Sequence, residues 1–171
     1  MTAGSGKIEL VSRPDMLVNR NYVPILESCN LFDFDRIYHF QGGSSVKQIR
    51  DRSISRMELQ TGAETRIFYL KRHTAACPGL WEMIGNFFSG KSPSPGMYEF
   101  ENICDFRNSG IPTVAPVAAG ERKTGFCRYE SFLVTESFEP YISLEHLIYN
   151  LPDRLKGAEG QIRKERLITA V

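Results

Sequence analysis

One cation in this sequence, Lys71, has the chemistry to bind a phosphate group or to pair with a carboxylate from a neighbouring helix. Lys71 closes the apolar part of residues 66–73, whose β-branched and aromatic residues are typical of a strand. A cation at the end of a buried strand is costly unless it meets an anion, and phosphate or a carboxylate from a neighbouring helix would supply one. The run itself leaves open a simpler interpretation, in which Lys71 extends from an edge strand into water.

A second candidate for phosphate chemistry is the glycine pair Gly42 and Gly43, which two serines follow. Residues 36–40, just before the pair, are predicted to form a short strand. A tight turn after a strand can present its N–H groups to phosphate. The same turn can equally be a plain hairpin connection, so the pair alone is a weak signal.

Residues 85–92 match the phosphate-loop pattern G-x-x-x-x-G-K-S letter for letter. That loop works between a strand and a helix that opens at its lysine, so that the helix N-terminus faces the phosphate. Here Pro93 and Pro95 follow at once, and proline disrupts a helix beyond its first turn. We therefore expect residues 85–96 to form an exposed connector, and the alternative of a phosphate-loop NTPase is disfavoured.

Composition sets bounds on the class of protein. The chain has 171 residues, of which 42% are hydrophobic and 11% aromatic, as expected for one globular domain or part of a larger one. A net charge of +1 gives no reason to expect nucleic acid as a partner. No apolar run has the length of a signal peptide core or a bilayer span. The cysteines lack the spacing of a zinc site or a disulfide framework and fit a reducing cytosol: they are Cys29, Cys77, Cys104 and Cys127.

The periodicity of the chain predicts an α+β fold, a five-stranded antiparallel sheet with one main helix. Three strands with short links suggest a meander, and two more strands follow the helix. A polar, poorly specified lead-in extends to about residue 19. The predicted elements are strands over residues 36–40, 52–59, 66–73, 111–121 and 131–136, a helix over residues 96–106, and further helices from Ser143 and from about Gln161.

The main helix carries the acid that Lys71 would need. Met97, Phe100, Ile103, Cys104 and Phe106 form its apolar stripe, and Gly110 fits a left-handed position after its end. Glu99 and Glu101 are expected in the first turn, where the helix dipole favours acids. Either both are surface acids that match the dipole, or one of them turns inward to hold Lys71.

Taken together, the elements resemble the N-terminal lobe of the protein-kinase fold, and more narrowly the lipopolysaccharide kinase family of bacterial heptose and Kdo kinases. The order and spacing of three matches carry the resemblance, which spans roughly residues 37–147. The matching segments are residues 68–73, then Glu99 with residues 110–113 and 116–121, then residues 131–136 with residues 143–145.

The resemblance implies a role for each matching residue. Lys71 would contact the α- and β-phosphates of ATP, and Glu99 would form the ion pair that positions it. Gly42 and Gly43 would cover the phosphates. The hinge, whose backbone groups hold adenine, would be Leu133, Val134, Thr135 and Glu136. The implied cofactors are ATP and Mg²⁺.

The resemblance also implies a division of the chain and a limit on its activity. Residues 1–35 would be an N-terminal extension, residues 36–136 the kinase-like lobe, and residues 137–171 the hinge and the start of a second lobe. The family's catalytic loop and its magnesium ligands lie downstream of the helix near Gln161, so the chain as given is expected to be inactive alone.

The implied function is an ATP-dependent phosphotransferase that acts on a sugar of the lipopolysaccharide core or a related glycolipid. Its implied location is the cytoplasm, with possible peripheral association at the inner face of the cytoplasmic membrane. The alternative is a non-catalytic nucleotide- or partner-binding module.

Overall fold

The computed structural model describes residues 7–49, 51–62, 64–76, 94–124 and 128–138. The chain separates into two compact units, Met1–Ser137 and Phe138–Val171. All the helices and strands described below belong to the first unit. None of these helices is long and apolar enough to cross a bilayer.

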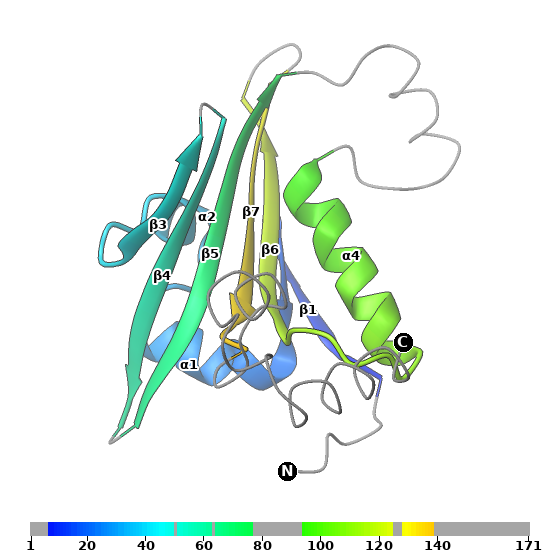
Figure 1. The fold of residues 1–171 in the computed structure, drawn as a ribbon. Coiled ribbons are helices and arrows are strands. Elements are labelled where there is room, and N and C mark those ends of the chain that lie inside the picture. The colour runs from blue at the N-terminus through cyan, green and yellow to red at the C-terminus, as the bar shows by residue number, and fades with distance from the viewer. Residues whose placement is uncertain (1–6, 50, 63, 77–93, 125–127, 139–171) are drawn as a thin grey trace, which may run out of the picture. The chain divides into compact units, whose positions relative to one another are not determined.

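The first unit is built on a seven-stranded sheet in the order β1-β2-β6-β7-β5-β4-β3 (Figure 1). Every pairing between neighbouring strands is antiparallel. The predicted α+β class with an antiparallel sheet is therefore confirmed, but the predicted number of five strands is wrong. The strands are β1 (Leu10–Arg13), β2 (Met16–Asn19), β3 (Ser44–Ile49), β4 (Arg52–Thr61), β5 (Glu64–Ala76), β6 (Pro116–Lys123) and β7 (Arg128–Glu136).

The additional strands include β1 and β2, in the segment that was expected to be a polar lead-in. Asp15 has a left-handed φ of 60° in the turn between them, and β2 pairs with β6. Met16 and Val18 are buried in the core. The expectation was wrong because two strands of four residues show too few apolar positions to stand out. The division at residue 35 stays a prediction.

Residues 36–40 were predicted as a strand, but residues 36–38 belong to helix α2 (Phe34–Tyr38), His39 is its C-cap, and Phe40 follows it. Asp33 is its N-cap, and its carboxylate accepts from the N–H groups of Asp35 (3.0 Å) and Arg36 (3.3 Å). Phe34, Ile37 and Tyr38 are buried at helical spacing. The strand prediction failed because five residues with β-branched and aromatic side chains satisfy both patterns, and the capping aspartate decides between them.

The helices cover both faces of the sheet (Figure 1). The short helices η1 (Arg20–Tyr22), α1 (Val23–Ser28) and α2 pack with the larger core cluster, which includes Phe68, Leu70, Phe132 and Val134. On the other face α4 (Pro95–Asn108) packs over Ala119 and Leu133. Successive residues of β5 and β7 therefore point alternately to the two cores.

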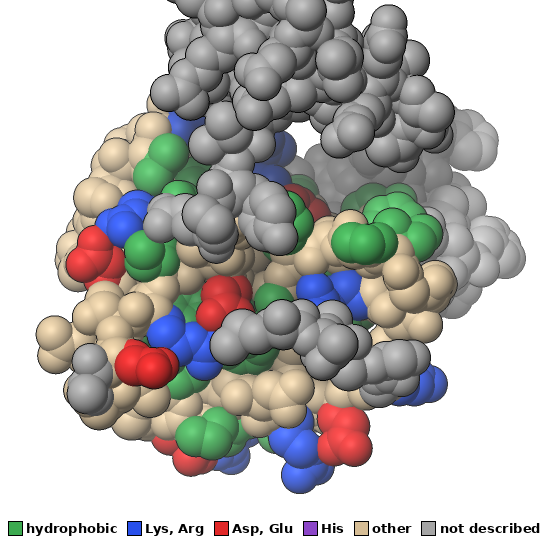
Figure 2. Space-filling model, turned by 60° about the horizontal axis from the view of Figure 1, so that its bottom comes forward, with side chains coloured by type: hydrophobic (Ala, Val, Ile, Leu, Met, Phe, Trp, Pro, Cys, Tyr) green, Lys and Arg blue, Asp and Glu red, His purple; other side chains and the backbone are tan. Residues whose placement is uncertain are grey.

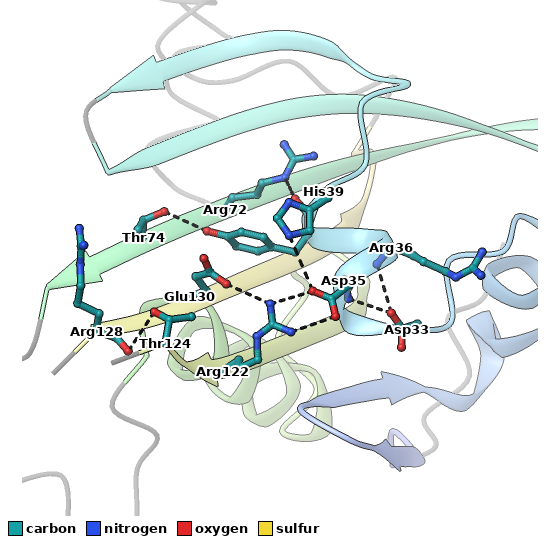
Figure 3. Close-up of polar contacts among 11 residues, drawn as sticks. Asp33, Asp35, Arg36, His39, Arg72, Thr74, Arg122, Thr124, Arg128 and Glu130 are labelled. Atoms are coloured by element: carbon teal, nitrogen blue, oxygen red, sulfur yellow. Dashed lines mark hydrogen bonds and ion pairs between the residues drawn. The ribbon is translucent and has the colours of Figure 1, made fainter. Parts of the chain in front are cut away.

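Two arginines fasten α2 to its face of the sheet (Figure 3). Arg72 of β5 donates to the carbonyl oxygens of Tyr38 (2.6 Å) and Phe40. Arg122 of β6 donates with both terminal nitrogens to the carboxylate of Asp35 (3.0 and 2.8 Å). The two contacts of Arg72 satisfy carbonyl oxygens at the end of the helix. Because Arg72 points to the face that α2 covers, its neighbour Lys71 points to the opposite face of β5.

Candidate active site

Lys71 lies on β5 and points to the face that α4 covers. It pairs with Ile54 of β4 and Leu133 of β7, and residues directly opposite each other share a face. Its Nζ lies 2.5 Å from Oε2 of Glu99 on α4. The predicted approach of these two residues is thus confirmed, and the alternative in which Lys71 extends into water is wrong.

The ion pair between Lys71 and Glu99 is only partly shielded from water. The exposed fractions of the two side chains are 22% and 40%. Pairs at such a surface contribute about 0–1 kcal/mol to the free energy of unfolding. The pair therefore orients the ammonium group of Lys71 more than it stabilises the fold.

The position of Glu99 depends on how α4 begins. Ser94 is the N-cap, and its hydroxyl oxygen accepts from the N–H of Met97 (3.3 Å). Pro95 occupies the first helical position, where its missing N–H costs nothing. The prediction that residues 85–96 form a connector is therefore wrong for Pro95 and Gly96, and residues 85–93 lie outside the described residues. Because the helix starts at Pro95, Glu99 is in its second turn, so the expected match to the helix dipole does not explain it.

Gly96 lets α4 approach the main chain of β7 closely. A Cβ at this position would lie 2.8 Å from the carbonyl oxygen and 3.1 Å from the nitrogen of Phe132, closer than side chains pack. The N–H of Gly96 donates to Oγ of Ser131 (3.3 Å). These contacts fix the height of the helix above the sheet, and thereby the height of Glu99.

The end of α4 is fixed by a Schellman motif. Gly110 has a left-handed φ of 79°, which confirms its predicted role. Its N–H donates to the carbonyl of Arg107 (3.0 Å), and the N–H of Ile111 donates to that of Phe106 (2.8 Å). The apolar stripe predicted for the helix is buried except at Phe106, which is 51% exposed. Exposed Phe106 and Ile111 stand at the two positions whose apolar contact commonly accompanies this motif.

His73 lies two residues after Lys71 and on the same face, and sequence analysis did not single it out. It is buried, with 4% of its surface exposed, and its Nε2 has no hydrogen-bond partner among the residues that the structure describes. Burial, with the nearby positive charges of Arg52 and Lys71, lowers the pKa of His73 to about 4. The imidazole is therefore neutral near pH 7. The signal for it was the spacing of two residues from Lys71 on one strand.

The predicted hinge residues lie inside β7. Leu133, Val134 and Thr135 each pair with both β5 and β6, so their main-chain groups face neighbouring strands. Their contact with adenine stays a prediction, and free main-chain groups for it would have to come from beyond the end of β7.

Glu136, the last predicted hinge residue, has a clear structural contact. Its carboxylate accepts from the hydroxyl of Tyr22 (2.6 Å) and from Nε and Nη2 of Arg66 (3.0 and 2.5 Å). Burial and the Glu136 carboxylate raise the pKa of Tyr22. This trio ties η1 to the ends of β5 and β7.

The glycine pair lies directly before β3 rather than after a strand. A Cβ on Gly43 would lie 2.7 Å from the carbonyl oxygen of Arg56, so close packing on β4 requires glycine there. By register, the start of β3 is level with Tyr69, whereas the turn from β3 to β4 is level with His73. The role of Gly42 and Gly43 over phosphate stays a prediction.

Within the described residues, no group of three His, Cys, Asp or Glu side chains is placed to hold a metal ion. Basic and acidic side chains are interspersed on the face seen in Figure 2, in keeping with a net charge of +1. That face therefore presents no broad field of one sign in its described residues.

An antiparallel sheet with a lysine–glutamate pair between sheet and helix is typical of kinases. The comparison with protein families agrees: residues 46–167 match the model of the lipopolysaccharide kinase (Kdo/WaaP) family, and the chain belongs to that family. The predicted family is thus confirmed.

Two known proteins show how far the similarity extends. The lipopolysaccharide core heptose(I) kinase WaaP of Pseudomonas aeruginosa is 33% identical over 91 residues, which are 53% of this chain and 33% of that protein. A solved structure of WaaP in complex with acyl carrier protein is similar with a TM-score of 0.51 and 22% identity, covering 86% of this chain and 48% of that one. The chain thus spans about a third of the curated relative, and the solved structure supports the fold alone.

Proposed function

We propose that this chain is the nucleotide-binding lobe of an ATP-dependent kinase that phosphorylates a sugar of the lipopolysaccharide core or a related glycolipid. The contact between Lys71 and Glu99 across the sheet–helix boundary carries the proposal. Family membership supports the class of reaction. The reaction is proposed for the cytoplasm, with acceptor lipid reached at the inner face of the membrane.

In this proposal Lys71 contacts the α- and β-phosphates, and Glu99 holds the ammonium group in place. Phosphoryl transfer depends mainly on positioning and on neutralising phosphate charge, so a preset cation contributes directly. Ser94 and Gly96 act indirectly, because they set where α4 begins and how closely it approaches β7. Magnesium would supply further neutralisation when bound, and we propose that its ligands lie outside the described residues.

Nucleotide binding by the 171-residue chain tests the proposal. Titration calorimetry with ATP is expected to show weak binding that Lys71→Gln removes and Glu99→Gln weakens. Lys123→Gln is the matched control, since it removes an exposed lysine at the end of β6. Equal ATP affinity in the Lys71→Gln and Lys123→Gln variants would contradict the assignment.

A second candidate function is a module that binds nucleotide or a partner without phosphoryl transfer. The match to the kinase relative covers 33% of that protein, so phosphoryl transfer by this chain is a separate proposal from nucleotide binding. Incubation with labelled ATP and a core-oligosaccharide acceptor separates the two. We expect no phosphoryl transfer by the 171-residue chain. If labelled acceptor forms with the wild-type chain but not with Lys71→Gln, the kinase function is favoured over the binding module.

A further inference from the structure

Three cations gather on the face of the sheet that carries Lys71. Arg52 pairs with His73, and Lys47 pairs with Ile54, which in turn pairs with Lys71. Residues directly opposite each other in antiparallel strands share a face, so Lys47, Arg52 and Lys71 point the same way. Neighbouring strands lie about 4.8 Å apart, which places the three side chains within reach of one small anion.

The two cations of the β3–β4 hairpin are not committed to other contacts within the described part of the chain. Lys47 and Arg52 are exposed and form no ion pair there. Arg56, further along β4 on the same face, is instead paired with Glu58. The hairpin therefore carries positive charge near its turn, beside Lys71, where Lys47 and Arg52 lie. At its other end the charge of Arg56 is neutralised by Glu58.

The turn of this hairpin also differs in composition from a phosphate-binding loop. The sequence of residues 49–52 contains no glycine, whereas loops that cradle phosphate with backbone N–H groups are rich in glycine. The carbonyl of Asp51 accepts from the N–H of Thr74 (2.9 Å), which holds the turn against β5. Side-chain charge is thus the means by which this hairpin can hold an anion.

We propose that Arg52 and Lys47 bind the phosphate tail of a nucleoside triphosphate beside Lys71, so that the β3–β4 hairpin holds phosphate by side-chain charge. The inference deepens the proposed function, on which it rests, and moves the phosphate-covering role from Gly42 and Gly43 to the hairpin. Buried His73 lies opposite Arg52 and two residues from Lys71, and the positive charges of both, together with burial, lower its pKa, which is consistent with a positive potential at this position.

Binding of inorganic tripolyphosphate and of ATP to the 171-residue chain tests the inference. At low ionic strength Arg52→Gln and Lys47→Gln are each expected to weaken both ligands about three- to tenfold, as for a partly exposed charge-assisted hydrogen bond. The effect should shrink in about 1 M salt, where the Debye length is about 3 Å. Arg36→Gln is the control, because it removes an exposed arginine on α2, on the opposite face.

Nuclear magnetic resonance of His73 gives a second readout that does not depend on activity. Tripolyphosphate bound between Arg52 and Lys71 should raise the pKa of His73 from about 4. Arg52→Gln should raise it without ligand, since one of the lowering charges is gone. An unchanged His73 titration on saturation with tripolyphosphate would contradict the site.

The outcomes separate this inference from the proposed function. If Lys71→Gln abolishes ATP binding while Arg52→Gln and Lys47→Gln bind normally, phosphate binding by the β3–β4 hairpin is wrong and the kinase proposal stands. If adenosine binds but tripolyphosphate does not, phosphate binding by the hairpin is again wrong. The hairpin also exposes Val46 and Ile49, so phosphatidylglycerol vesicles serve as a further arm. Arg52-dependent binding to vesicles without an effect on tripolyphosphate would assign the cations to a lipid surface and overturn the inference.

Discussion

Replacing Gly96 by alanine tests whether the helix start sets the geometry of the ion pair. The added Cβ would lie 2.8 Å from the carbonyl oxygen of Phe132, against an ordinary contact of 3.4 Å or more. The helix N-terminus must therefore retreat from β7 by about 0.6 Å, because the sheet backbone is held on both sides. Glu99 follows Gly96 by three residues, about 4.5 Å along the axis, so it moves with this turn.

The expected energy of Gly96→Ala combines two opposing effects. Overpacking costs about 1–3 kcal/mol, and alanine recovers about 0.5–1 kcal/mol of helix propensity. We expect the free energy of unfolding in urea to fall by about 0.5–2 kcal/mol. Since Glu99 would move away from Lys71, ATP affinity should fall as well.

Gly110→Ala is the control for Gly96→Ala. Its φ of 79° makes alanine strained, but a Cβ there meets nothing within 4 Å. It should cost about 1–2 kcal/mol of stability and leave ATP affinity unchanged, because the far end of α4 carries no part of the ion pair. A structure of Gly96→Ala with the contact between Lys71 and Glu99 intact and ATP affinity at the wild-type level would refute the reasoning.

Three further predictions concern groups around the site. Glu136→Gln should lower the free energy of unfolding by about 1–3 kcal/mol in urea titrations, more than Tyr22→Phe, because it removes the negative charge opposite Arg66 and turns one of the two acceptor oxygens, Oε2 for Tyr22 and Oε1 for Arg66, into an NH2 donor. The pKa of His73 lies near 4 in the folded chain, below its unfolded value near 6.5. Its contribution to the free energy of unfolding is therefore full above about pH 6.5 and is lost as the pH falls toward 4. His73→Gln should therefore flatten the loss of stability in that pH range, by at most about 3 kcal/mol; an unchanged slope would show that His73 is not the group. Ser94→Ala should cost about 1 kcal/mol of stability through the lost N-cap, and a cost as small as that of an exposed control such as Ser45→Ala would contradict it.

The sequence predicted the parts of the site that depend on local pattern. The strand with Lys71 and the helix with Glu99 are long, periodic segments, and Gly110 marked the helix end by its backbone requirement. The contact between Lys71 and Glu99 followed from the cost of leaving a cation unpaired at the end of a buried strand.

The parts that failed depend on pairing between distant segments. Strand β2 acquires its burial from β6, about a hundred residues later, and β1 pairs only with β2, so their own four-residue patterns were too short to show either strand. Residues 131–136, by contrast, were correctly predicted as a buried strand, since Leu133 and Val134 are paired on both sides, and their role as a hinge stays a prediction. Strand β4 was predicted over residues 52–59 but β3 was missed, and the register that places Arg52 opposite His73 cannot be read from either strand alone.

The contacts around α4 indicate that the placement of the helix determines the ion pair between Lys71 and Glu99, and not the reverse. Ser94 and Gly96 fix one end of the helix by main-chain contacts, and Gly110 fixes the other. A partly exposed ion pair is too weak to hold a helix of 14 residues against a sheet, whereas buried packing and caps together are strong enough. The helix therefore places Glu99, and Glu99 in turn places Lys71, so a change that moves α4 should alter phosphate binding even when both charged residues remain.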